Sequence, residues 1–281
     1  MNVVRWLQSF FVGHPPNRTI AQQAHHEEGP PLVALSATPD KPESFGYKIS
    51  WIAARDLTSR QMADVLELQN VLRANWTTGL AAAHSSAPPF RVFITPPISG
   101  WTLAIGRGLP YPIDIEASDG SDRTIGARFD ALLQRIKPHS PETLFFATHR
   151  GAGLDAWARM RGARIERVFA FCEQQVLANR GEQTTEEHAL GLPDLGARDP
   201  PEADAFLNDI YNAWSARRAA LLATGTEWEK METGAGRGPY PDELDTLNLA
   251  AAWSIDPRTL HERSALRGVG LAGILPTSIR I

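Results

Sequence analysis

Glycines at positions 151 and 153, followed by Ala156, form the pattern G-x-G-x-x-A directly after an apolar segment. In dinucleotide-binding folds such glycines let the backbone approach a pyrophosphate at a helix N-terminus, and an acidic residue roughly 20 positions later binds ribose hydroxyls. Glu173 stands at that distance. The segment left for the helix, residues 154–162, is short for a crossover between parallel strands. Gly151 and Gly153 therefore predict a plain turn without a cofactor, with a nucleotide site as the alternative.

Histidine and acidic residues give little support for a metal centre. The run from His25 to Glu28 places two imidazoles beside two carboxylates, but it lies in a Pro-rich segment without a second ligand cluster at a compatible spacing. The pattern His-Glu-x-x-His does not occur, and the other histidines are scattered along the sequence. We therefore expect no bound metal.

Nucleophilic catalysis lacks its usual sequence patterns, since neither a Gly-x-Ser-x-Gly elbow nor a Walker loop occurs. The single cysteine, Cys172, ends an apolar segment, where a buried and unreactive thiol is typical. Aromatic residues of the expected strands could stack RNA bases, but the glycine-aromatic arrangement of an RNA-recognition motif is absent, which favours core packing. These residues are Phe90, Phe93, Trp101, Phe145 and Phe146. No catalytic residues are predicted.

The composition is that of an ordinary globular protein. The 281 residues are 43% hydrophobic and 21% charged, which excludes wholesale disorder. A net charge of -4 gives no support for a chain that coats nucleic acid. The first residues lack a convincing signal-peptide cleavage site, and no run approaches the ~20 apolar residues of a membrane span. We therefore expect a cytoplasmic protein without nucleic-acid or membrane partners.

The elements that would position these residues follow from the hydrophobic pattern. Strands are predicted at residues 47–54, 90–94, 101–107 and 143–149, and helices at residues 58–72 and 128–136. This order is the βαββαβ arrangement of a ferredoxin-like unit with a mostly antiparallel sheet. Arginines that alternate with apolar residues predict two further antiparallel strands on either side of Gly162. The expected fold class is therefore α+β.

Beyond Cys172 the pattern becomes helical. Thr184 and Glu187 form a capping box, and two prolines open a long helix that extends to about residue 225. Asp242 is placed to cap a further helix. The last residues, from Gly268 onward, are compatible with either a strand or an ordered tail.

Charge divides the chain at the same place. Between Glu173 and Glu262, 17 acidic and 7 basic residues give a net charge of -10, whereas the rest of the chain carries +6. We expect an N-terminal helix and Pro-rich linker (1–44), an α+β sheet region (45–172) and a mainly helical acidic region packed on the sheet (173–281). An acidic region of this size attracts basic partners, although solvated helix surfaces are the favoured explanation of the asymmetry.

Three segments carry a resemblance to a known group of proteins. They are a tryptophan-bearing ribbon that leads to Arg-x-Phe-x-Phe, then Gly-Glu-x-Thr-x-Glu-Glu, then an acidic stretch that ends in Trp-Ser-x-Asp-Pro. The matching positions are Trp157, Arg167, Phe169, Phe171, Gly181, Glu182, Thr184, Glu186, Glu187, Trp253, Ser254, Asp256 and Pro257. Over about residues 157–260 the chain resembles a family of bacterial proteins associated with secreted toxin systems.

The resemblance implies a non-enzymatic immunity protein that neutralises a cognate toxin by masking its active site. Acidic residues would then bind a basic toxin, for example a nuclease-like domain. The candidate partner-binding residues are Glu182, Glu186, Glu187, Glu202, Asp204, Asp209, Glu227, Glu229, Asp242, Glu243 and Asp245. Two alternatives remain open: a nucleotide-binding enzyme that uses the Gly151–Gly153 turn, and a structural or regulatory interaction module.

Overall fold

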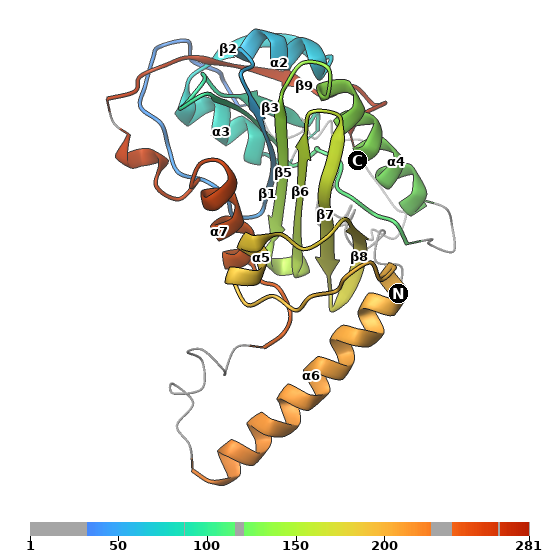
Figure 1. Cartoon of the computed structure of the whole chain (residues 1–281). Helices are drawn as coiled ribbons and strands as arrows, with labels where there is room; N and C mark the ends of the chain where they lie inside the picture. The colour runs from blue at the N-terminus through green and yellow to red at the C-terminus, as the bar shows by residue number, and fades with distance from the viewer. Residues whose placement is uncertain (1–32, 87, 116–120, 226–237, 264, 281) are drawn as a thin grey trace, which may run out of the picture.

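The computed structural model describes residues 33–86, 88–115, 121–225, 238–263 and 265–280, and the expected N-terminal helix and the His25–Glu28 run lie outside these ranges. The fold is α+β, with one antiparallel sheet of nine strands in the order β2-β9-β3-β4-β1-β5-β6-β7-β8 (Figure 1). The strands are β1 (Ile49–Arg55), β2 (Gln69–Ala74), β3 (Arg91–Ile94), β4 (Trp101–Ile105), β5 (Glu142–His149), β6 (Leu154–Arg161), β7 (Arg164–Cys172), β8 (Gln175–Arg180) and β9 (Gly270–Ile274).

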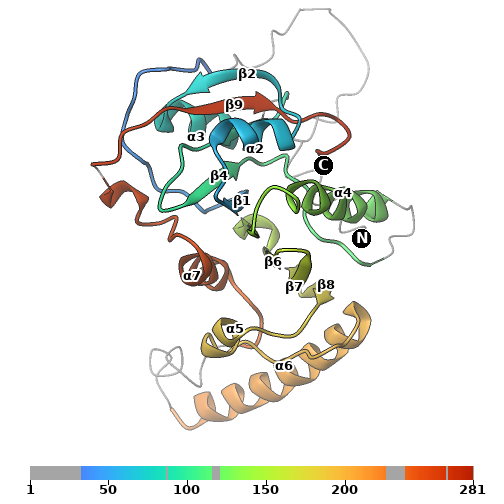
Figure 2. The same cartoon turned by 45° about the horizontal axis from the view of Figure 1, so that its top comes forward.

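Six α-helices of the described ranges cover the sheet on both faces (Figure 2). They are α2 (Ser59–Val65), α3 (Trp76–His84), α4 (Ser121–Ile136), α5 (Thr185–Ala189), α6 (Pro200–Ala223) and α7 (Glu243–Trp253), with short 3₁₀ turns η1 (Arg150–Ala152) and η3 (Leu260–Glu262). None of these helices combines the length and the apolar character that crossing a bilayer requires.

The hydrophobic core lies in two layers, one on each face of the sheet. In β1, Ile52 points toward the layer that α2 and α4 cover, whereas Trp51 points toward the layer that α3, α6 and α7 cover. Successive strand residues face opposite sides of a sheet, so a central strand covered on both sides must be apolar throughout. Trp51 stacks on Phe146 of β5, with ring centroids 5.2 Å apart, and Phe146 in turn contacts Trp253 of α7.

Most of the locally encoded elements agree with the sequence predictions. The strands β1, β3, β4 and β5 lie where they were expected, and β6 and β7 form a hairpin at Gly162, whose φ of 52° is one that glycine adopts without strain. Thr58 with Gln61 and Thr184 with Glu187 form complete capping boxes. The long helix α6 begins at Pro200 after its cap Asp199 and extends away from the body (Figure 1).

Two predictions of local structure are wrong. The helix expected over residues 58–72 ends at Val65, and Glu67 adopts a left-handed φ of 51° that turns the chain into β2. The strand forms there because residues 69–74 pair with β9, a partner that local periodicity does not reveal. Between β2 and β3 the chain also forms α3, which Asn75 caps and which the prediction lacked.

The region beyond Cys172 contributes strands as well as helices. β8 pairs with β7 at one edge of the sheet, and β9 lies between β2 and β3 near the other edge. The segment from Gly268 onward therefore contains a strand, β9, which five residues form and which irregular chain follows. Residues 173–281 share the sheet with residues 45–172 in addition to packing helices on it.

Candidate functional site: a carboxylate-lined pocket

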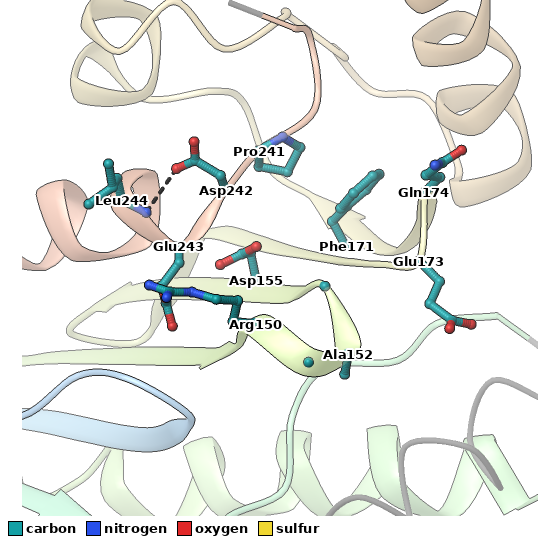
Figure 3. A pocket seen from close by; sticks show the side chains of 12 residues that line it. Arg150, Ala152, Asp155, Phe171, Glu173, Gln174, Pro241, Asp242, Glu243 and Leu244 are labelled. Atoms are coloured by element: carbon teal, nitrogen blue, oxygen red, sulfur yellow. Dashed lines mark hydrogen bonds and ion pairs between the residues drawn. The ribbon is translucent and has the colours of Figure 1, made fainter.

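A pocket of about 570 Å³ opens at one end of the sheet, where three segments meet (Figure 3). Its walls are the β5–β6 connection, the turn between β7 and β8, and the first residues of α7 with the segment before them. The lining side chains are Arg150, Ala152, Asp155, Phe171, Glu173, Gln174, Pro241, Asp242, Glu243 and Leu244, together with the backbone of Gly151 and Gly153. Its volume is within the range usual for small-ligand pockets.

The glycines of the G-x-G-x-x-A pattern lie in this pocket, but the backbone around them differs from that of a Rossmann dinucleotide site. Gly153 has a left-handed φ of 54° and closes the turn η1, with its N–H donating to the carbonyl of Arg150 at 3.3 Å. The chain then enters β6, where Leu154 pairs with His149 of β5. A dinucleotide site needs a helix after the glycines and a parallel strand beyond it. An antiparallel hairpin occupies that place, so the plain-turn prediction for the local backbone is confirmed.

Asp155 forms part of the floor of the pocket. It shares a face of the sheet with Trp157 and is only 5% exposed. Its Oδ1 accepts a hydrogen bond from Thr246 Oγ1 of α7 at 3.2 Å. Burial, the largest cause, and the carboxylates of Asp242, Glu243 and Asp245 together raise the pKa of Asp155 to about 8, against a lowering by the Thr246 hydrogen bond. The Asp155 carboxyl is therefore largely protonated at neutral pH.

An ion pair forms one side of the pocket mouth. Arg150 donates from Nη2 and Nε to Glu243 Oε2, at 2.6 and 2.9 Å. The Glu243 side chain is 9% exposed whereas that of Arg150 is 73% exposed and lies over the ring of Tyr47. Glu243 Oε1 is buried and receives no hydrogen bond from the part of the chain that the structure describes.

The start of α7 brings further carboxylates to the pocket. Asp242 caps the helix as predicted, accepting hydrogen bonds from the backbone N–H groups of Leu244 and Asp245, at 2.8 and 3.1 Å. Asp245 completes the capping box by accepting from the N–H of Asp242 at 2.8 Å. Acidic side chains are favourable at this end of a helix because its free N–H groups carry partial positive charge. The cap thus explains why so many acids converge here.

A second cluster lies in the core beside the pocket. Glu187 accepts at Oε1 from Trp157 Nε1 and Arg167 Nε, both at 2.8 Å, and at Oε2 from the N–H of Thr184. Arg167 Nη1 also donates to Asn179 Oδ1 at 2.7 Å. Several residues that carry the resemblance therefore have structural roles in the core.

The predicted partner-binding residues do not form one surface. Glu187, Glu243 and Asp245 are buried, at 1%, 8% and 1% exposure, so none of them lies on the open surface, although Glu243 lines the pocket. Each has an internal donor, which is why a carboxylate is tolerated there. The exposed candidates are Glu182, Glu202, Asp209 and Asp242, and the partly buried ones are Glu186 and Asp204. Two further candidates, Glu227 and Glu229, lie outside the described residues.

Both of the partly buried acids already have partners in the protein. Glu186 forms an ion pair with Arg159, with 3.7 Å between Oε1 and Nη1. Asp204 accepts from the N–H of Val176, the second residue of β8. The pocket instead combines Asp242 and Glu243 with two residues that the sequence analysis missed, Asp155 and Arg150. One signal pointed to Asp155: it is the lone acid of β6, and apolar residues flank it on both sides.

The pocket favours ligands that donate hydrogen bonds or carry positive charge. Four carboxyl groups line it against one guanidinium, and the lining residues that the structure describes include no serine, cysteine, lysine or histidine. Within the described ranges, no three histidine, cysteine or acidic side chains are arranged as metal ligands. No family model, curated protein or solved structure matches this chain.

Proposed function

We propose that this chain is a binding protein for a basic partner and, in the form that the resemblance implies, an immunity protein that masks the active site of a secreted bacterial toxin. One observation carries the proposal: Asp155, Glu173, Asp242 and Glu243 surround a single pocket, and Arg150 is the one cation among its described lining residues. A concave acidic surface attracts a basic protein and fixes its orientation on docking.

The exposed acids beyond the pocket extend the same charge. Glu182 precedes α5, and Glu202 and Asp209 lie on α6. Because the interaction of exposed charges is screened by salt, these residues would accelerate encounter more than they would tighten the final complex. The proposed site of action is the cytoplasm, where a toxin delivered into the cell would be met.

The proposal extends to the architecture of the scaffold. We propose that β1, α2, β3, β4, α4 and β5 form a ferredoxin-like unit, into which β2 and α3 are inserted. The neighbour order β3-β4-β1-β5, with every pair antiparallel, supports this. The acidic, mainly helical segments after Cys172 would then be additions that supply the binding surface.

The test begins with affinity capture of the tagged full chain from its native host, at low and at moderate salt. The gene for any stoichiometric partner is then expressed with and without this chain. An immunity protein predicts that the partner alone stops growth, that co-expression restores growth, and that moderate salt weakens capture. A partner whose expression is harmless would refute the immunity role and favour a structural or regulatory module. A chain recovered with a bound nucleotide would favour the enzyme alternative.

Charge reversal identifies the contact surface in the same assay. The triple variant Glu182→Lys, Glu202→Lys and Asp209→Lys is expected to weaken partner binding at least ten-fold. Asp64→Lys is the control for the single variant Glu202→Lys, because both change the net charge by +2 and Asp64 lies on α2 at the opposite face with its side chain 57% exposed. Equal weakening by the control would show that only net charge matters, which would contradict a defined acidic surface.

A further inference from the structure

Two nearly buried carboxyl groups line the pocket, and one of them keeps a buried oxygen without a donor. Glu243 Oε1 receives no hydrogen bond from the described residues, and the one hydrogen bond to the Asp155 carboxyl comes from Thr246 to Oδ1. In Figure 3 the Asp155 carboxyl points away from its strand, toward the segment that carries Pro241 and Asp242. Buried carboxyl oxygens are normally satisfied, so Glu243 Oε1 indicates a missing donor.

We infer that the pocket binds a guanidinium or primary ammonium group on an alkyl stem, with Asp155 and Glu243 as its carboxylate partners. A positively charged group with several N–H donors can donate to Glu243 Oε1 and to the Asp155 carboxylate together. Phe171 supplies an aromatic ring in the pocket wall, against which an alkyl stem or a cation packs favourably.

Arg150 occupies part of this site in the structure described. Its guanidinium already binds Glu243 Oε2 with two donors, which shows that this wall of the pocket accepts guanidinium geometry. With 73% of its side chain exposed, Arg150 can rotate into solvent at little cost. An incoming cation therefore competes with Arg150 for Glu243, and removal of Arg150 is expected to tighten cation binding. An anionic ligand would show the opposite response.

Binding is also linked to protons. Asp155 has a pKa of about 8, so a cation that requires the ionised carboxylate displaces a proton when it binds at neutral pH. The charged groups that surround Asp155 are Arg150 from η1, Glu173 from the β7–β8 turn, Asp242 from the segment before α7, and Glu243 and Asp245 from α7, with the neutral thiol of Cys172 nearby. Cation affinity is therefore expected to rise with pH up to about 8.

The same chemistry can come from two sources, an arginine or lysine side chain of a protein partner or a free alkylamine. In the first case the inference rests on the proposed function, since the toxin would insert a basic side chain into the pocket. In the second case the pocket is a small-molecule site of its own. The experiment uses probes that need no knowledge of the partner.

The experiment is isothermal titration of the full chain with agmatine, N-acetyl-arginine amide and the uncharged isostere N-acetyl-citrulline amide at pH 8.5. We expect saturable binding of the two guanidinium probes and at least ten-fold weaker binding of the citrulline probe. Asp155→Asn should weaken the guanidinium probes at least ten-fold, and Arg150→Gln should tighten them at least three-fold. Asp64→Asn, which removes the same charge at a distant exposed site, should leave the affinity of both guanidinium probes unchanged.

The affinity for agmatine should rise at least five-fold from pH 6.5 to 8.5, except in Asp155→Asn.

Three results would overturn the inference: no saturable binding of either guanidinium probe, equal binding of the citrulline probe, or weaker probe binding by Arg150→Gln. The Arg150→Gln arm holds even if Asp155→Asn fails to fold, because a misfolded protein would not bind more tightly. If agmatine also displaces a captured toxin, the partner supplies the cation. If the probes bind but the toxin is unaffected by Asp155→Asn, the pocket serves a free alkylamine. Absence of probe binding together with growth rescue would refute this inference while the immunity role stands.

Discussion

Arg167 and Glu187 form an ion pair inside the core: Nε donates to Oε1 at 2.8 Å, and the side chains are 3% and 1% exposed. The same carboxylate also accepts from Trp157 and from the backbone of Thr184, so it joins β6, β7 and the start of α5. A buried pair of this kind is tolerable only because its remaining hydrogen bonds are also satisfied. It fixes α5 and the chain after β8 to the sheet beside the pocket.

Breaking this pair is expected to destabilise the protein strongly. Glu187→Gln leaves the Arg167 guanidinium buried without its counter-charge, and a loss of about 3 kcal/mol or more in the free energy of unfolding follows. Urea denaturation monitored by circular dichroism measures it. Glu182→Gln, an exposed neighbour in sequence, should change the same free energy by about 0.5 kcal/mol or less. Equal effects of the two variants would contradict the structural role of the pair.

Asp155 is expected to make stability fall as pH rises between about 4 and 8. Its pKa is about 8 in the folded state, against a usual value of 3.8, so in this interval the folded protein holds a proton that the unfolded chain has released. Each pH unit then costs up to about 1.4 kcal/mol from this group. Asp155→Asn lacks the titration, so it should exceed the wild type in unfolding free energy at pH 8 and lose this slope. Parallel stability curves from pH 5 to 8 would contradict the assignment.

Gly181 is expected to tolerate no side chain. Its φ is 80°, and a Cβ there would lie 2.0 Å from the backbone oxygen of Glu166. Gly181→Ala should therefore cost about 3 kcal/mol or more, since β7 or the chain after β8 must move. Gly191→Ala measures the cost of the left-handed backbone alone, without a steric clash. Gly191 has a similar φ of 75°, and a Cβ there would have no heavy atom within 4 Å. It should cost only about 1–2 kcal/mol in thermal or urea unfolding. A smaller loss for Gly181→Ala than for Gly191→Ala would rule out the clash.

Cys172 is expected to be unreactive in the folded protein. It is fully buried, its Sγ donates to the carbonyl of Ala152 at 3.1 Å, and burial raises the pKa of its thiol well above the usual value. A colourimetric thiol reagent at pH 8 should label less than about a tenth of the native protein in the time that labels the protein in guanidinium chloride completely. Rapid labelling without denaturant would show that the packing of Ala152 over the Cys172 thiol opens in the folded protein.

The sequence predicts those parts of the fold that neighbouring residues encode. β-branched and aromatic residues identified β1, and alternation identified the β6–β7 hairpin. The spacing of Thr184 and Glu187 identified one cap, and the residue type of Asp242 before a helical segment identified the other. The β2–β9 pairing escaped prediction because its register joins Leu72 to Ala272, two positions with no local signal of each other. The ordinary spacing of leucines over 66–72 favoured a helix instead.

The candidate site was predicted only in part, and for the wrong reason. Gly151, Gly153 and Glu173 were singled out for a nucleotide, yet they line a pocket whose character comes from Asp155 and Glu243. An acid in a strand and an acid at a helix start become one site only when α7 packs over β6. Tertiary packing decides that contact, and the acidic composition alone did not distinguish the buried carboxylates from the exposed ones.

The position of β9 has a consequence for biosynthesis. Val92 of β3 pairs with Gly273, so the edge of β3 and the whole of β2 lack their neighbour until the ribosome has made residues 270–274. At about 5–20 residues per second this interval lasts on the order of ten seconds or more. During it an open apolar edge is exposed to other nascent chains, the situation in which strands associate wrongly. The supply of co-translational chaperones, rather than the stability of the finished sheet, would then limit the yield of this protein.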